Sequence, residues 1–165
     1  MTRVALIHAL AHSVGPINQE MASAWPEAVR MNLLDDSLSA DLARSGAGLD
    51  ATMHRRFEAL AAYAEGTGAR AILFTCSAFG PCIEAVAAAR PHMPVFKPNE
   101  AMVAEAVAMG GRIGLIASFA PTLASMPPEF PSGTVLDTQL AEGAMAALDQ
   151  GDGDSHDALV CEAAR

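Results

Sequence analysis

The stretch AILFTCSAFGP, residues 71–81, decides the fold of this chain. Residues 71–75 form a largely apolar run of the length of a buried strand. Gly80 and Pro81 follow shortly afterwards and predict the start of a helix, because proline is tolerated in a first helical turn. Cys76 is therefore expected where a strand leads into a helix.

The same order of elements recurs along the chain. An apolar run predicts a further strand at residues 4–7, and strands are also expected at 29–34 and 95–96, with helical segments between them. Asp50 and Asn99 are expected to cap two of these helices. This alternation predicts an α/β fold in which helices cover both faces of a parallel sheet, a flavodoxin- or Rossmann-like lobe. Ligands of such sheets bind at the carboxyl ends of the strands, where Cys76 is expected.

An internal repeat predicts a second lobe. The run RVALI begins at Arg3, and the similar run RIGLI begins at Arg112. A strand at residues 134–136 and a helix opened by Asp154 or Asp157 repeat the order of the first half. We therefore expect two pseudo-symmetric α/β lobes.

The lobes are expected at residues 1–98, which carry Cys76, and at residues 99–165. A counterpart of Cys76 in the second copy would fall at about position 180–185. This is beyond the last residue, Arg165. The second lobe is accordingly expected to be incomplete and the sequence to be a piece of a longer protein.

Composition limits the possible functions. The chain has 165 residues, of which 52% are hydrophobic, and a formal net charge of −9. The negative charge argues against binding to nucleic acid or to an anionic membrane surface. No run is long enough to cross a membrane, and three cysteines without framework spacing do not suggest a disulfide scaffold. A reducing cytoplasm is therefore expected, with Cys76 as a free thiol.

The position expected for Cys76 is compatible with several chemistries. A thiolate at a helix N-terminus is stabilised by the helix dipole and can act as nucleophile or general base. A Cys-x5-Arg phosphatase is excluded because Cys82 occupies the arginine position, and no Cys-x-x-Cys redox pair exists. A Cys–His hydrolase and proton transfer at carbon both remain open. In the simplest alternative, Cys76 is a small buried apolar residue.

Neighbouring polar groups are candidate substrate contacts. Ser77 and the backbone N–H of Ala78 can donate hydrogen bonds to a carboxylate at a helix N-terminus. Asn99 follows a strand and can reach the same edge, and His8 ends the first strand. Each has a structural alternative: Ser77 and Asn99 as helix caps, and His8 as a polar strand end. His8 and His12 follow a strand, so no metal site is expected.

The three runs AILFTCSAFGP, KPNEAM (residues 97–102) and RIGLIASF (residues 112–119) resemble the aspartate/glutamate/hydantoin racemase superfamily. The likeness extends over the whole chain. Members of that superfamily use no cofactor and include racemases, arylmalonate decarboxylases and maleate isomerases. Their fold is two similar α/β lobes with the substrate between them.

The resemblance implies that Cys76 is the first-lobe cysteine, which exchanges a proton with the substrate carbon. It also implies that Ser118 is a carboxylate-binding hydroxyl. We therefore expect a cofactor-independent racemase or isomerase that moves a proton next to a carboxylate or carbonyl. The alternatives are a one-cysteine decarboxylase or isomerase and a non-catalytic carboxylate-binding or assembly protein. A homo-oligomer is expected because an incomplete sheet leaves an open edge.

Overall fold

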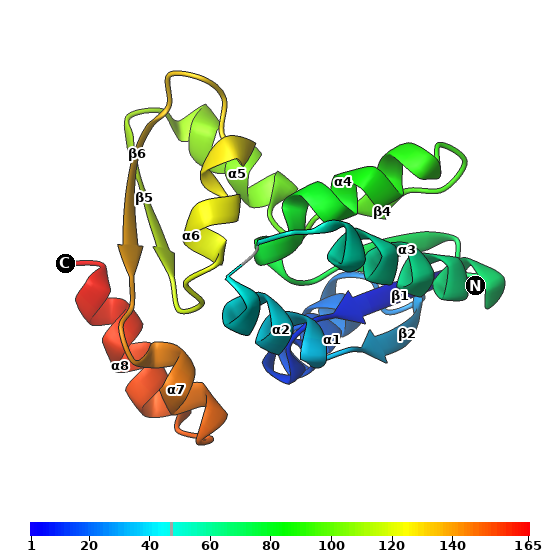
Figure 1. Cartoon of the computed structure of the whole chain (residues 1–165), viewed down its shortest axis with the longest axis horizontal. Helices are drawn as coiled ribbons and strands as arrows, with labels where there is room; N and C mark the ends of the chain where they lie inside the picture. Colours follow the sequence, from blue (N-terminus) through cyan, green and yellow to red (C-terminus); the bar gives the residue numbers. More distant parts are fainter. Residues whose placement is uncertain (47) are drawn as a thin grey trace. The chain divides into compact units, whose positions relative to one another are not determined.

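The computed structural model describes residues 1–46 and 48–165. The chain divides into two compact units, Met1–Pro98 and Asn99–Arg165 (Figure 1). They are called unit 1 and unit 2 below.

Unit 1 contains a four-stranded parallel sheet with strand order β2-β1-β3-β4. The α/β fold with a parallel sheet is thus confirmed. The predicted strands are all present, although β1 is longer than expected and β3 ends one residue earlier. The strands are β1 (Arg3–His8), β2 (Val29–Leu34), β3 (Ala71–Phe74) and β4 (Val95–Phe96).

Helices pack on both faces of this sheet (Figure 1). On one face, Val4 and Leu6 of β1 contact Ile17 and Met21 of α1. On the other face, Phe57 of α3 stacks against Phe74 of β3. The helical segments are η1 (Ala11–Ser13), α1 (Val14–Ala24), α2 (Ser37–Ser45), α3 (Ala51–Gly66), η2 (Ser77–Phe79) and α4 (Gly80–Ala89).

Local sequence explains most of these helices. The Asp50 side chain accepts a hydrogen bond from the Met53 N–H at 2.8 Å, which confirms Asp50 as the cap of α3. Pro81 lies in the first turn of α4 as predicted. Helix α2 was not predicted, although Leu38 and Leu42 are buried one turn apart on it.

Three aromatic rings form the centre of the core next to the candidate site. The ring of Phe57 lies 5.1 Å from that of Phe74 and 4.9 Å from that of Phe79. Such stacked and tilted rings contribute beyond the area they bury. Because Phe74 precedes Cys76 and Phe79 follows it, the cluster anchors the backbone on both sides of the cysteine.

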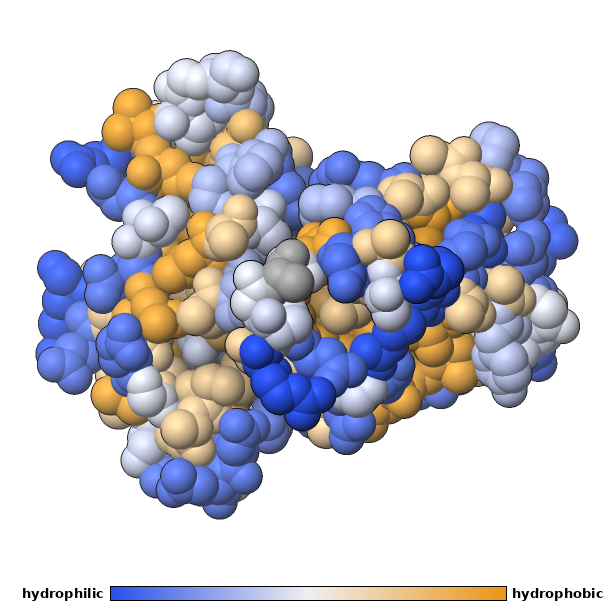
Figure 2. Space-filling view, in the orientation of Figure 1, coloured by the Kyte–Doolittle hydropathy of each residue, from blue (hydrophilic) through white to orange (hydrophobic). Residues whose placement is uncertain are grey.

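Unit 2 contains a parallel two-stranded sheet, β5-β6. Val103, Leu115 and Met126 form its hydrophobic cluster. Figure 2 shows that hydrophobic side chains also reach the surface of this unit. Its elements are α5 (Glu100–Met109), β5 (Arg112–Ala117), α6 (Thr122–Ser125), η3 (Pro127–Glu129), β6 (Val135–Leu140), α7 (Ala144–Asp149) and α8 (Gly153–Ala163).

The pairing of strands reflects the internal repeat. Arg3 of β1 lies opposite Val29 of β2, and Arg112 of β5 lies opposite Val135 of β6, both in parallel pairs. Two details of the prediction were wrong. Strand β6 continues to Leu140 instead of ending at residue 136, because it pairs along the whole length of β5. Helix α8 is capped by Asp152 rather than by Asp154 or Asp157.

Candidate functional site

Cys76 lies just beyond the carboxyl end of β3. The Thr75 N–H donates to the Ile7 carbonyl at 3.0 Å, which continues the ladder between β1 and β3 by one residue. Cys76 then has an extended backbone, with φ of −124° and ψ of 121°, and precedes the single turn η2. Helix α4 starts only at Gly80. The predicted strand-to-helix junction is therefore correct, with a 3-10 turn inserted between the cysteine and the helix.

The thiol is enclosed on the side of the core. Cys76 is 9% exposed and lines a narrow gap that has no room for a water molecule. Its other lining residues come from β1, the loop after it, α2, α3 and β3: Ile7, His8, Ala9, Leu38, Phe57 and Phe74. The surroundings of the sulfur within this gap are largely apolar.

Burial raises the pKa of the Cys76 thiol above its ordinary value, although the Ala78 N–H and the Ser39 hydroxyl act to lower it. Removal from water disfavours the charged thiolate. The expectation of a thiolate stabilised by a helix N-terminus was therefore wrong in its net effect. Desolvation outweighs the donors, and the thiol carries its proton at neutral pH.

The Ala78 N–H was predicted to contact substrate. Within unit 1 it is a hydrogen-bond donor to the Cys76 sulfur and lowers the pKa of that thiol. Ser39 was not predicted at all. It lies on α2, is 2% exposed, and was missed because that helix was missed. The signal that could have found it is the spacing of Leu38 and Leu42 directly after Asp36, which precedes the first helical residue.

His8 belongs to a hydrogen-bond network across three strand ends. It is fully buried, and its Nε2 donates to Asn32 Oδ1 at 2.9 Å. Its Nδ1 accepts from the Thr75 hydroxyl at 2.9 Å and lies 3.0 Å from the Ser13 oxygen, whose own proton is donated to the Leu10 carbonyl at 2.8 Å. Asn18 Nδ2 donates to the same Asn32 oxygen at 2.7 Å, which assigns that oxygen as an acceptor.

Burial lowers the pKa of His8, while its hydrogen bond to Asn32 opposes the change. The imidazole is therefore neutral at pH 7. Both ring nitrogens have partners within unit 1, so a substrate contact by His8 stays a prediction that requires one of these bonds to open. Thr75, a member of this network, directly precedes Cys76 in the sequence.

The other predicted contacts lie in different places. Ser77 is half-buried in η2. Asn99 precedes α5, but its side chain forms no cap hydrogen bond, and its buried Nδ2 has no partner among the described residues. Ser118 is half-buried directly after β5. Unit 1 thus brings Cys76, Ser77 and Ala78 together, whereas Asn99 and Ser118 belong to unit 2.

The remaining cysteines differ from Cys76. Cys82 is fully buried on α4, and burial raises its pKa to about 11, assisted by the charge of Asp50. It is a core residue. Cys161 is exposed on α8. Leu159 lines a pocket, but residues two apart on a helix lie on different faces, so the Cys161 side chain faces solvent.

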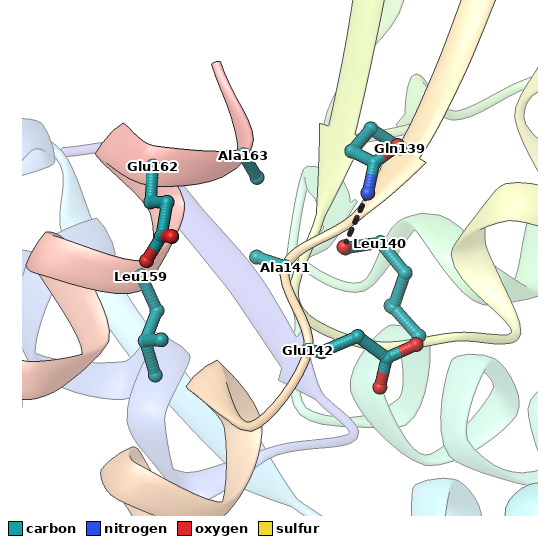
Figure 3. A pocket seen from close by; sticks show the side chains of 7 residues that line it. All are labelled: Gln139, Leu140, Ala141, Glu142, Leu159, Glu162 and Ala163. Carbon is teal, nitrogen blue, oxygen red and sulfur yellow. Dashed lines mark hydrogen bonds between the residues drawn. The ribbon is translucent and has the colours of Figure 1, made fainter. Parts of the chain in front are cut away.

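That pocket lies within unit 2 and has a volume of about 310 Å³ (Figure 3). Glu142 and Glu162 place carboxylates at it, and the Gln139 amide donates to the Leu140 carbonyl at 3.2 Å. Two carboxylates repel an anionic ligand. The pocket is therefore an unsuitable place for a carboxylate-bearing substrate.

Within residues 1–46 and 48–165, no cluster of three or more His, Cys, Asp or Glu side chains has a metal-binding arrangement. None of the helices there combines the length and apolar character needed to span a membrane.

The chain matches one protein family in sequence and a solved enzyme structure in fold. Residues 14–125 match the family described as Asp/Glu/Hydantoin racemase, a match that includes Cys76 and Ser118. Glutamate racemase from Aquifex pyrophilus has a similar fold, with a TM-score of 0.59 and 17% identity over 84% of this chain. The chain spans 55% of the length of that enzyme. No curated protein sequence gives a significant match. Because the family match covers about two thirds of its residues, the chain belongs to the Asp/Glu/hydantoin racemase family.

Proposed function

We propose that this protein is a cofactor-independent racemase- or isomerase-type enzyme that moves a proton at a carbon next to a carboxylate or carbonyl, with Cys76 as the acid/base group. The observation that carries the proposal is the position of Cys76. It lies at the carboxyl edge of a parallel sheet, within the segment that matches the racemase family. Ligands of such sheets bind at this edge.

The protonation state of Cys76 favours the acid half of this chemistry. Because burial raises the pKa of the thiol, it holds its proton until a stronger base appears. A carbanion or enolate formed next to a carboxylate is such a base. The S–H bond then breaks, a C–H bond forms, and the sulfur keeps the electron pair as a thiolate. The Ala78 N–H is a donor for that thiolate.

We propose Ser77, Asn99 and Ser118 as donors for the substrate carboxylate, and His8 as a further contact. The support differs among them. Asn99 has a buried amide nitrogen without a partner among the described residues, and a buried unpaired donor requires an explanation. Ser77 adjoins Cys76 directly, and Ser118 follows a strand at the same end as Cys76 follows β3.

Proton–deuterium exchange in D2O, followed by NMR, tests the proposal. Aspartate, glutamate, hydantoins, arylmalonates and maleate form the substrate panel. Exchange at carbon, or deuterium incorporation after decarboxylation, is expected with the wild-type chain and with a version extended at its C-terminus. Cys76→Ser should abolish it, whereas Cys161→Ser should retain it because Cys161 is exposed. Exchange that survives Cys76→Ser unchanged contradicts the acid/base role.

A non-catalytic carboxylate-binding protein is the second candidate. It is favoured by the enclosed Cys76 thiol, whose burial raises its pKa and lowers its reactivity. Thermal stabilisation by dicarboxylates, without exchange in either version of the chain, would support this candidate. Loss of that stabilisation in Asn99→Ala, with Asn18→Ala as a comparison, would assign the binding contact.

A further inference from the structure

The hydroxyl of Ser39 is an unexplained polar group in the core. Ser39 is 2% exposed, and its Oγ has no hydrogen-bond partner within the described parts of the chain. Buried His8, by contrast, has partners for both of its ring nitrogens. A buried hydroxyl without a partner costs free energy, so a native protein that keeps one gives reason to look for a role.

The start of α2 lies beside the candidate site. Leu38, the residue before Ser39, lines the same narrow gap as Cys76. The first turn of α2 therefore lies against the cysteine. The Ser39 hydroxyl is also close enough to the sulfur to lower the pKa of the thiol. Ser39 and Ala78 thus approach the same sulfur, one with a side chain and one with a backbone N–H.

A thiol and a thiolate differ as partners for these donors. The neutral sulfur is a weak acceptor, whereas the thiolate carries a full charge. Hydrogen bonds to a charged acceptor are about twice as strong as neutral ones. A serine hydroxyl that lacks a good partner beside the thiol would gain one when the thiol loses its proton.

We propose that Ser39 is a hydrogen-bond donor to the Cys76 thiolate that remains when the thiol gives its proton to carbon. The catalytic part of this inference rests on the proposed function, whereas the hydrogen bond itself does not. Ser39 acts through Cys76 and is therefore a positioning residue. Together with the Ala78 N–H, it supplies two donors on a sulfur that is otherwise in apolar surroundings.

The test measures the ionisation of Cys76 in Ser39→Ala and Ser39→Thr. Protein labelled with ¹³C at cysteine Cβ, in a Cys161→Ser background, is titrated by NMR. Cys82 is the internal reference, because burial raises its pKa to about 11. Removing a donor to the charged form should raise the pKa of Cys76 in Ser39→Ala by about 1, a tenfold lower thiolate fraction at a given pH. Ser39→Thr retains a hydroxyl and should restore most of the wild-type value.

A purely structural role predicts a different result. Because the Ser39 hydroxyl has no hydrogen-bond partner among the described residues, Ser39→Ala should leave the free energy of unfolding in urea unchanged or raise it. Loss of a structural hydrogen bond would lower that free energy. Ser37→Ala, an exposed change on the same helix, should leave the pKa of Cys76 unchanged. An unchanged pKa of Cys76 in Ser39→Ala overturns the inference. The titration needs no turnover, so a wild-type chain without exchange activity would refute the proposed function alone.

Discussion

The aromatic cluster around Phe57 should control the stability of unit 1. Phe57 is 2% exposed and contacts both Phe74 and Phe79. Truncation of a buried phenylalanine to alanine costs about 3–5 kcal/mol of unfolding free energy. A typical domain has only about 5–15 kcal/mol in total. Phe57→Ala should therefore remove a large part of the stability of unit 1.

Phe57→Leu separates the contribution of the ring contacts from that of the buried apolar volume. Leucine keeps much of the apolar volume but loses the two ring contacts, which contribute about 0.5–1.5 kcal/mol each. We expect a loss of about 1–3 kcal/mol. Tyr63→Ala is the matched control on the same helix, because Tyr63 is 61% exposed and should cost less than about 0.5 kcal/mol.

Urea unfolding followed by tryptophan fluorescence is the assay. Trp25 is the single tryptophan of the chain and lies in unit 1, so its emission reports on the unit that contains Phe57. The same samples can be treated with a thiol reagent, since a cavity at Phe57 opens the gap beside Cys76 and should speed its modification. A loss below about 1 kcal/mol in Phe57→Ala, or an equal loss in Tyr63→Ala, would refute this view of the core.

Three further predictions concern pH and helix capping. Because burial raises the pKa of Cys82 from 9.0 to about 11, its stabilising contribution is complete below pH 9 and is lost as the pH rises toward 11. Unfolding free energy should fall by about 2–3 kcal/mol over that interval, and Cys82→Ala should flatten the decline. Burial lowers the pKa of His8 below 6.5, so stability should decrease as the pH falls through 6.5. Urea midpoints at pH 7 and pH 5 should differ less in His8→Gln; an equal difference would contradict the buried neutral ring. Asp50→Ala should cost about 1 kcal/mol, whereas Asp36→Ala, which removes a residue without a side-chain cap bond, should cost little.

Sequence alone determined the features that depend on local pattern. Continuous apolar runs marked β1 and β3, because a strand covered on both faces has no polar face. Asp50 marked the start of α3, because an aspartate side chain satisfies a free N–H in the first turn. The repeated runs after Arg3 and Arg112 marked two parallel strand pairs, and the segment around Cys76 indicated the family.

Tertiary structure decided the features that depend on packing between distant segments. The state of the Cys76 thiol is one of them, since its burial comes from Leu38, Phe57 and Phe74, and desolvation cannot be read from the residues beside it in the chain. The engagement of His8 with Asn32 and Thr75 arises only when three strands align. Ser39 approaches Cys76 because the short helix α2 packs on the sheet. Helix and strand patterns are local, whereas the charge state and partners of a buried group depend on everything that excludes water from it.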